Sequence, residues 1–274
     1  MENQTVRSAQ MKILEIMKYI DRLCRNNGIV YYIMGGTALG AVRHGGFIPW
    51  DDDLDIFMTP DQYEKFKKAL LSDNNPDFIL QEWKTIPDFL EYAKVRMNGT
   101  TFIEENFKDR KDMHHGIYVD IMILHKVPKN IFIQKLVYFE SKFVTLYANS
   151  QRNWKPKTKF QTFALKFLKV LPCKWMARTA YKRIYGYDDM KEDFLYCYWI
   201  TRADFKGGLF DASLFSDPID VAFEDTVLMG SDKIKEYLSL RYGDYMKMPP
   251  PEARKSAVHA HILDTEKDFS EYLG

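Results

Sequence analysis

The feature that most constrains the fold is the stretch 50–57, WDDDLDIF, in which an acidic run leads directly into a predicted apolar strand. Because side chains alternate along a strand, Asp53 and Asp55 fall on one face and Leu54 and Ile56 on the other. Two adjacent carboxylates repel each other unless a cation lies between them. Oxygen ligands at this spacing suit Mg²⁺ or Mn²⁺, which usually also contact substrate phosphates.

A second signal lies upstream, where a β-branched and aromatic run at 30–34 ends in Gly35 and Gly36. The two glycines let the backbone approach a phosphate closely, and the amides of the short helix expected at 38–42 point at that phosphate. Thr37 is the expected cap of this helix and, with the two glycines, an expected substrate contact. The sequence therefore predicts a phosphate cradle close to a metal-binding carboxylate pair.

An exposed acidic turn with local capping bonds is the alternative interpretation of the acidic run. The strand–Gly-Gly–helix unit that precedes the run argues against it. An EF-hand loop is excluded, because its central glycine and closing glutamate are missing at the required offsets.

Composition narrows the class of protein further. The 274 residues are 46% hydrophobic and 28% charged, which is typical of a globular chain rather than a disordered one. The three cysteines form no CxxC pair, so neither a disulfide scaffold nor a cysteine-rich zinc finger is expected. Neither a secretory signal nor a transmembrane helix is expected. Strands mix with helices without strict βαβ alternation, which predicts an α+β fold.

A specific resemblance rests on two blocks, residues 35–44 (GGTALGAVRH) and 46–55 (GFIPWDDDLD). They look like the LicD family, which includes bacterial phosphocholine transferases and is related to fukutin and fukutin-related protein. The resemblance continues at 118–121 and 221–224, and resumes at 242–246 with Pro249, Pro250 and Arg254. The spacing from Gly36 to Asp53 exceeds that in most of the wider nucleotidyltransferase fold but agrees with LicD.

The resemblance implies a polymerase-β-like nucleotidyltransferase core, a mixed β-sheet with helices, at 1–125. A basic helical lobe is expected at 126–200, and a C-terminal segment at 201–274 that packs back on the core. Residues 126–183 hold 14 Lys and Arg against one acid, Glu140. This segment is either a solvated helical surface or a surface that meets an anionic partner, and its apolar stripe is expected at 160–171.

The implied activity is transfer of phosphocholine, or a related phospho-alcohol, from a CDP-alcohol such as CDP-choline to a hydroxyl of a cell-surface glycan precursor. Teichoic acid and lipopolysaccharide are such glycans, and CMP is released. Asp53 and Asp55 would hold Mg²⁺ or Mn²⁺, with Asp120 as the third carboxylate. Asp51 is a base or an extra ligand. A buried structural ion pair is the alternative for Asp120.

Further substrate contacts are expected around these carboxylates. Arg43 and His44 leave the helix beside the phosphate loop, and either would contact phosphate. The alternative for both is that the side chain packs against the protein or faces solvent. Trp50, with Tyr118, would contribute to an aromatic cage for a trimethylammonium group. Glu224 would pair with that cation or with a substrate sugar. The four histidines at 114, 115, 259 and 261 lack zinc spacing.

Two other functions stay open. The same carboxylates would serve nucleotidyl transfer, in which the acceptor attacks the α-phosphorus of an NTP and pyrophosphate leaves. A non-enzymatic module that binds membrane or nucleic acid through the basic segment would not need Asp53 or Asp55. The leading interpretation expects no nucleic acid. It places the protein in the cytoplasm, with peripheral contact between 126–183 and the inner face of the membrane, where a lipid-linked acceptor would lie.

Overall fold

A mixed five-stranded sheet forms the centre of the computed structural model, which describes residues 2–82, 92–150, 158–159, 162–163, 173–200, 204–254 and 259–273. Its strands, in spatial order, are β1 (Tyr32–Ile33), β2 (Asp55–Met58), β6 (Tyr118–Ile123), β4 (Ala93–Met97) and β3 (Phe78–Gln81). β2 and β6 are parallel, and the other neighbours are antiparallel. The mixture of such a sheet with helices confirms the α+β class.

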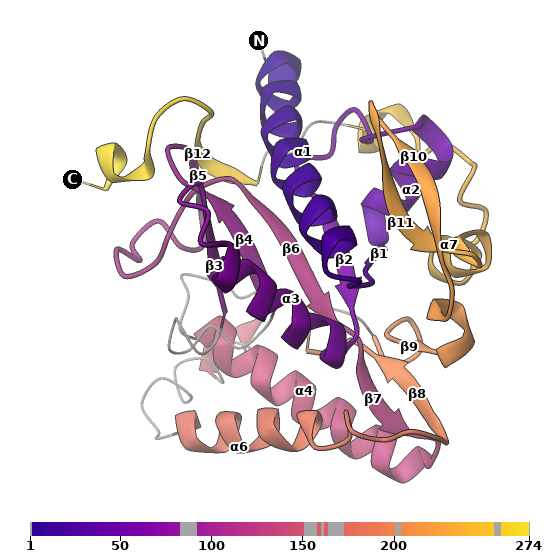
Figure 1. The fold of residues 1–274 in the computed structure, drawn as a ribbon. Helices are drawn as coiled ribbons and strands as arrows, with labels where there is room; N and C mark the ends of the chain where they lie inside the picture. Colours follow the sequence, from indigo (N-terminus) through magenta and orange to yellow (C-terminus); the bar gives the residue numbers. More distant parts are fainter. Residues whose placement is uncertain are drawn as a thin grey trace.

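Helices α1 (Glu2–Asn26) and α3 (Pro60–Asp73) cover one face of this sheet (Figure 1). Ile13 and Ile20 of α1 are seven residues apart and therefore fall on one face of the helix. Both isoleucines are almost fully buried, as are Val119 and Ile121 of β6. Because side chains alternate, the neighbours Tyr118, Asp120 and Met122 face the opposite side of the sheet.

Helix α2 (Gly35–His44) begins two residues before the expected cap. Gly35 has a φ of 53°, a left-handed conformation that a glycine adopts without the strain of a side chain. The prediction that Thr37 caps the helix is wrong, because Met34 occupies the N-cap position. Thr37 Oγ1 instead accepts a hydrogen bond from the Asp55 N–H at 2.9 Å, which fastens the first helical turn to β2.

The C-terminal part of the chain packs on the same core. The hairpin β10 (Pro218–Phe223) and β11 (Thr226–Ser231) lies beside β1, and α7 (Ile234–Tyr242) contacts α2. Tyr237 and Phe215 pack edge-to-face on Phe57 of β2. β12 (Ala260–Asp264) pairs with β5 (Thr101–Glu104). Short 3₁₀ helices lie at Ala212–Phe215, Pro251–Ala253 and Phe269–Tyr272.

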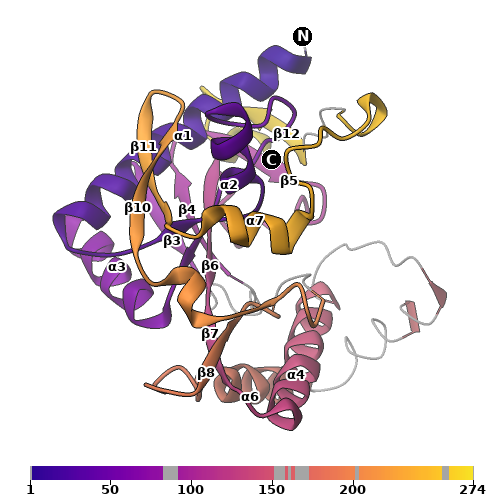
Figure 2. The same cartoon turned by 90° about the vertical axis from the view of Figure 1, so that its right-hand side faces the viewer.

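A second apolar cluster belongs to the basic lobe. Here α4 (Ile131–Ser150) and α6 (Cys173–Tyr185) pack together beside the small sheet of β7 (His125–Pro128), β8 (Phe194–Cys197) and β9 (Leu209–Phe210). Figure 2 shows this group below the central sheet. Trp199 is its largest fully buried side chain.

No helix in the described part of the chain combines the length and hydropathy that crossing a membrane requires. The division into three domains stays a prediction.

Candidate active site

A row of charged side chains crosses three strands of the central sheet. Asp55 of β2 is in register with Asp120 of β6, and Asp120 is in register with Lys94 of β4. Residues in register on neighbouring strands share a face, so these side chains lie side by side opposite α1 and α3. The parallel pairing of β2 with β6 therefore brings together two of the carboxylates that the sequence predicted.

Lys94 neutralises the middle of this row. Its side chain is 1% exposed, and Nζ lies 2.7 Å from Asp120 Oδ1 and 4.0 Å from Glu104 Oε2. Nζ also lies 3.3 Å from the ring centroid of Tyr118, a cation–π contact. Asp120 thus forms the buried ion pair that was the alternative interpretation, while a role as a metal ligand stays a prediction.

The row opens into a cleft of about 440 Å³. Six predicted site residues line it, namely Gly35, Gly36, Asp53, Asp55, Tyr118 and Asp120. The remaining lining residues are Met34, Tyr92, Glu104, Glu105, Asn106, Phe107, Met122, Tyr198, Asp204, Arg241, Tyr242 and His259. The cleft thus joins the start of α2 to the acidic edge of β2 and β6.

The carboxylates at this edge raise one another's pKa. The pKa of Asp55 lies well above its usual range, because the side chain is desolvated and because Asp53 and Asp120 are nearby. Desolvation, followed by the charge of Asp52, raises the pKa of Asp53. Desolvation and the Asp53 charge raise the pKa of Asp51 to about 8. The site therefore carries negative charge that a cation would relieve.

The strand begins later than predicted, which separates Asp51 and Asp53 from β2. Only Asp55 lies on the strand. Asp53 and Asp55 nevertheless line the same cleft, as their predicted alternation with Leu54 and Ile56 requires. Asp51 still hydrogen-bonds with Asp53, although it does not line the cleft. A Cβ at Gly36 would lie 2.5 Å from Asp51 Oδ2, so this glycine leaves room for the carboxylate.

Asp52 is buried and holds the C-terminal segment. It is 2% exposed, and its Oδ1 lies 2.6 Å from His259 Nδ1, while its Oδ2 accepts the His259 N–H at 2.7 Å. This hydrogen bond raises the pKa of His259 to about 9. In the described ranges, no three His, Cys, Asp or Glu side chains are arranged so that they could hold a metal ion as they stand.

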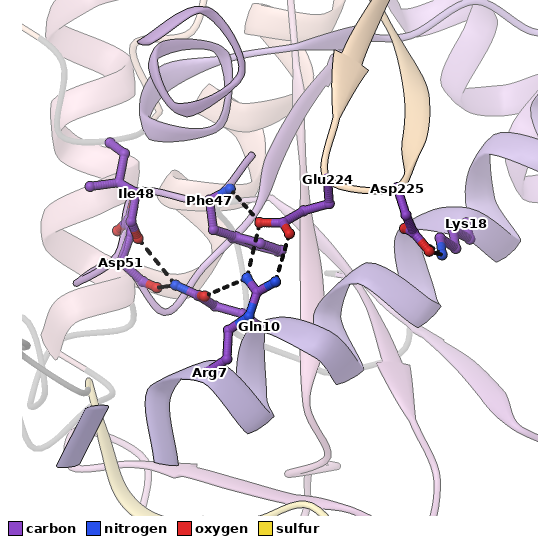
Figure 3. Close-up of polar contacts among 8 residues, drawn as sticks. All are labelled: Arg7, Gln10, Lys18, Phe47, Ile48, Asp51, Glu224 and Asp225. Atoms are coloured by element: carbon purple, nitrogen blue, oxygen red, sulfur yellow. Dashed lines mark hydrogen bonds and ion pairs between the residues drawn. The ribbon is translucent and has the colours of Figure 1, made fainter. Parts of the chain in front are cut away.

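Helix α1 braces the loop that leads to the acidic run (Figure 3). Gln10 Nε2 donates to the carbonyl oxygens of Ile48 at 3.1 Å and Asp51 at 2.7 Å. Arg7 forms two hydrogen bonds with Glu224, at 2.9 and 2.6 Å, and Glu224 also accepts the Phe47 N–H at 3.0 Å. The predicted substrate contact of Glu224 is not supported, because Arg7 and the loop occupy this carboxylate.

Three other predicted contacts also lie off the cleft wall. Arg43 Nη1 donates to the Tyr245 carbonyl at 3.1 Å and so binds the segment after α7. His44 packs edge-on to Trp50, with ring centroids 6.1 Å apart. None of the three belongs to the lining residues of this cleft, so the packing alternative fits them better than phosphate or cage contacts. Thr37, also an expected substrate contact, does not line the cleft either.

Sequence reasoning missed Lys94, which lies beside the cleft in the charged row, and Arg241, which lines the cleft. Lys94 carried no local signal, because only the pairing of β4 with β6 brings it to Asp120. Arg241 comes from the last turn of α7. The signal that could have found it is its place directly before the matching block 242–246.

Comparisons with known proteins identify the family of the chain. Residues 28–172 match the family model described as LicD/FKTN/FKRP, nucleotidyltransferase domain. The chain is 27% identical over 259 residues to the lipopolysaccharide cholinephosphotransferase LicD of Haemophilus influenzae, covering 93% of this chain and 96% of that protein. A Rickettsia prowazekii protein is 29% identical over 128 residues, 47% of this chain and 44% of its own length.

A shorter likeness involves the human ribitol 5-phosphate transferase FKRP, which is 43% identical over 42 residues, 15% of this chain and 8% of that protein. The family model covers more than half of the chain and includes Asp53, Asp55 and Asp120. These likenesses indicate a transferase, and the chain belongs to the LicD family.

Proposed function

We propose that the protein transfers phosphocholine, or a related phospho-alcohol, from a CDP-alcohol to a hydroxyl of a cell-surface glycan precursor, with release of CMP. One observation carries the proposal: Asp53, Asp55 and Asp120 line one cleft together with the glycines that open α2. The printed activities of the relatives, cholinephosphotransferase and ribitol 5-phosphate transferase, support the same class of reaction.

The carboxylate pair fits a divalent cation. Asp53 and Asp55 offer oxygen ligands, and desolvation together with neighbouring carboxylates raises the pKa of both groups, a condition that a bound cation would relieve. We propose that they hold Mg²⁺ or Mn²⁺, with Asp120 as the third carboxylate. Such an ion, when bound, neutralises diphosphate charge and lowers the pKa of an acceptor hydroxyl.

The chain's own groups would orient the donor around this pair. The N-terminus of α2 faces the cleft through Gly35 and Gly36, and a helix N-terminus favours a phosphate anion. The Gly35 N–H donates to the Tyr237 hydroxyl at 3.0 Å, which fixes the turn that presents Gly36. We propose that Asp51 acts on the site through its hydrogen bond with Asp53.

The rest of the cleft suits a cationic alcohol. Tyr92, Tyr198 and Tyr242 line it together with Glu105 and Asp204, and aromatic faces beside carboxylates attract a quaternary ammonium group. Lys94 Nζ lies 3.3 Å from the ring centroid of Tyr118 but 5.1 Å from that of Tyr92, and the Arg241 guanidinium lies 5.9 Å from those of Tyr198 and Tyr242. Tyr118 is therefore a poorer cage residue than the other three. We propose this wall as the site of the head group.

The product that leaves tests the proposal. The protein would be incubated with Mg²⁺, a glycan-lipid extract and either a panel of CDP-alcohols or CTP, and the products separated chromatographically. We expect CMP from at least one CDP-alcohol, together with head-group phosphate on the acceptor. Pyrophosphate from CTP, without CMP from any CDP-alcohol, would instead identify a nucleotidyltransferase.

A further inference from the structure

Helix α4 is apolar on two opposite sides. One side packs in the second apolar cluster through Val137, Val144 and Ala148, each at most 1% exposed. On the other side Phe132, Leu136 and Phe139 are 79%, 54% and 67% exposed. Their i, i+4, i+7 spacing aligns them along one face of the helix. We call these three side chains the outer stripe.

The outer stripe is more than scattered surface hydrophobicity. Single exposed apolar residues are ordinary, but a contiguous row of large ones marks a surface that meets an apolar phase or a partner. The neighbouring helix α6 also exposes two large apolar side chains, Trp175 and Met176, which are 73% and 52% exposed. Folding of the lobe therefore leaves a group of large apolar side chains in water on two packed helices.

The positive charge of the lobe favours an anionic surface as the partner of the outer stripe. Lys135 is exposed beside the stripe, and the single acid of the segment, Glu140, is neutralised by Arg183 at 2.7 Å. The whole segment 126–183 carries 14 basic residues against that one acid. Two copies of such a lobe would repel each other, whereas a surface of anionic lipid would attract it.

We propose that the outer stripe docks the protein on an anionic lipid bilayer, with Phe132, Leu136 and Phe139 entering the interface and the basic side chains facing lipid phosphates. An amphipathic helix of this kind lies in the plane of the membrane. The apolar stripe expected at 160–171 lies mostly outside the described residues. Phe163, which is described, is 67% exposed. The docking surface is thus placed on α4, and it does not depend on the chemistry of the cleft.

Vesicle co-sedimentation of the full chain tests the proposal. Vesicles of phosphatidylcholine alone would be compared with vesicles that also contain phosphatidylglycerol, at low and high salt. We expect binding to the anionic vesicles that weakens as salt rises. Phe132→Ser and Phe139→Ser should each lower the partition coefficient about tenfold, because each removes a large apolar side chain from the interface.

Matched variants separate docking from general effects. Leu71→Ser on α3 removes a side chain that is 61% exposed and should leave vesicle binding unchanged. Lys135→Glu should weaken binding roughly tenfold, while Lys65→Glu, an exposed lysine on α3, should not. In Phe139→Trp, lipids with brominated chains should quench the fluorescence more strongly than in the wild type.

Three outcomes would overturn the proposal. The first is no binding to anionic vesicles, and the second is equal binding to neutral ones. The third is equal losses in Phe132→Ser and Leu71→Ser. A wild-type dimer in solution that Phe132→Ser dissociates, without vesicle binding, would assign the stripe to a second copy of the chain instead.

Discussion

Replacing Lys94 by Met tests whether the charged row holds the sheet together at the site. The substitution keeps the length of the side chain but leaves the carboxylate of Asp120, 6% exposed, without its cation. Removing one partner of a buried ion pair costs about 3–5 kcal/mol, because the remaining charge stays desolvated. Lys94→Met should therefore lower the free energy of unfolding by about that amount, measured by urea titration in the presence of chelator.

A double-mutant cycle isolates the pair. Asp120→Asn alone should cost less than Lys94→Met, because Glu104 and the Tyr118 ring remain within reach of the ammonium group. An unpaired neutral amide costs about 1–3 kcal/mol, so Lys94→Met/Asp120→Asn should recover about 2 kcal/mol relative to Lys94→Met. Turnover should not return in the double variant, because the third carboxylate is gone. Simple addition of the two losses would refute the reasoning, and Lys65→Met on α3 serves as the exposed control.

Three other perturbations address the site and its support. Gly36→Ala should lower turnover more than stability, because the added Cβ would displace the Asp51 carboxylate. Steady-state kinetics and thermal unfolding of the same variant test this, and an equally large loss of stability would contradict it. His114 Nδ1 accepts the Gly116 N–H at 3.0 Å, and burial lowers the pKa of this imidazole from 6.5 to about 4. Its stabilising contribution should be complete above pH 6.5 and be lost as pH falls toward 4, by at most about 3 kcal/mol, and His114→Gln should flatten a stability profile over that window. Chelator should abolish turnover, and Mg²⁺ or Mn²⁺ should restore it. Full activity in excess chelator after dialysis would contradict the proposal that turnover requires a divalent cation.

Local patterns were enough to predict the central part of the site. The alternation of Leu54 and Ile56 with Asp53 and Asp55 depends only on neighbouring residues, and both carboxylates line the cleft. The start of α2 could not be predicted as well from local patterns. Thr37 is a good cap by residue type, but Gly35 begins the helix earlier, and the Thr37 hydroxyl binds β2 instead. The choice between these arrangements depends on the packing of α2 against the strand.

Contacts between distant segments could not be predicted from one sequence. Nothing in the sequence around Glu224 indicates an ionic partner, because that partner, Arg7, lies 217 residues away on another element. Lys94 and Asp120 come together only through strand register, 26 residues apart. A local pattern reports which residues share a face, whereas their ionic partners depend on how the strands and helices assemble.

The release of CMP by Asp55→Asn tests the central claim most directly. The variant would be compared with the wild type and with Asp225→Asn, which alters an exposed carboxylate paired with Lys18 2.7 Å away. Loss of a cation ligand removes several kcal/mol of charge stabilisation, so Asp55→Asn should lower turnover at least about a hundredfold. Asp225→Asn should match the wild type. CMP release by Asp55→Asn at a rate close to that of the wild type would contradict the assignment of the active site.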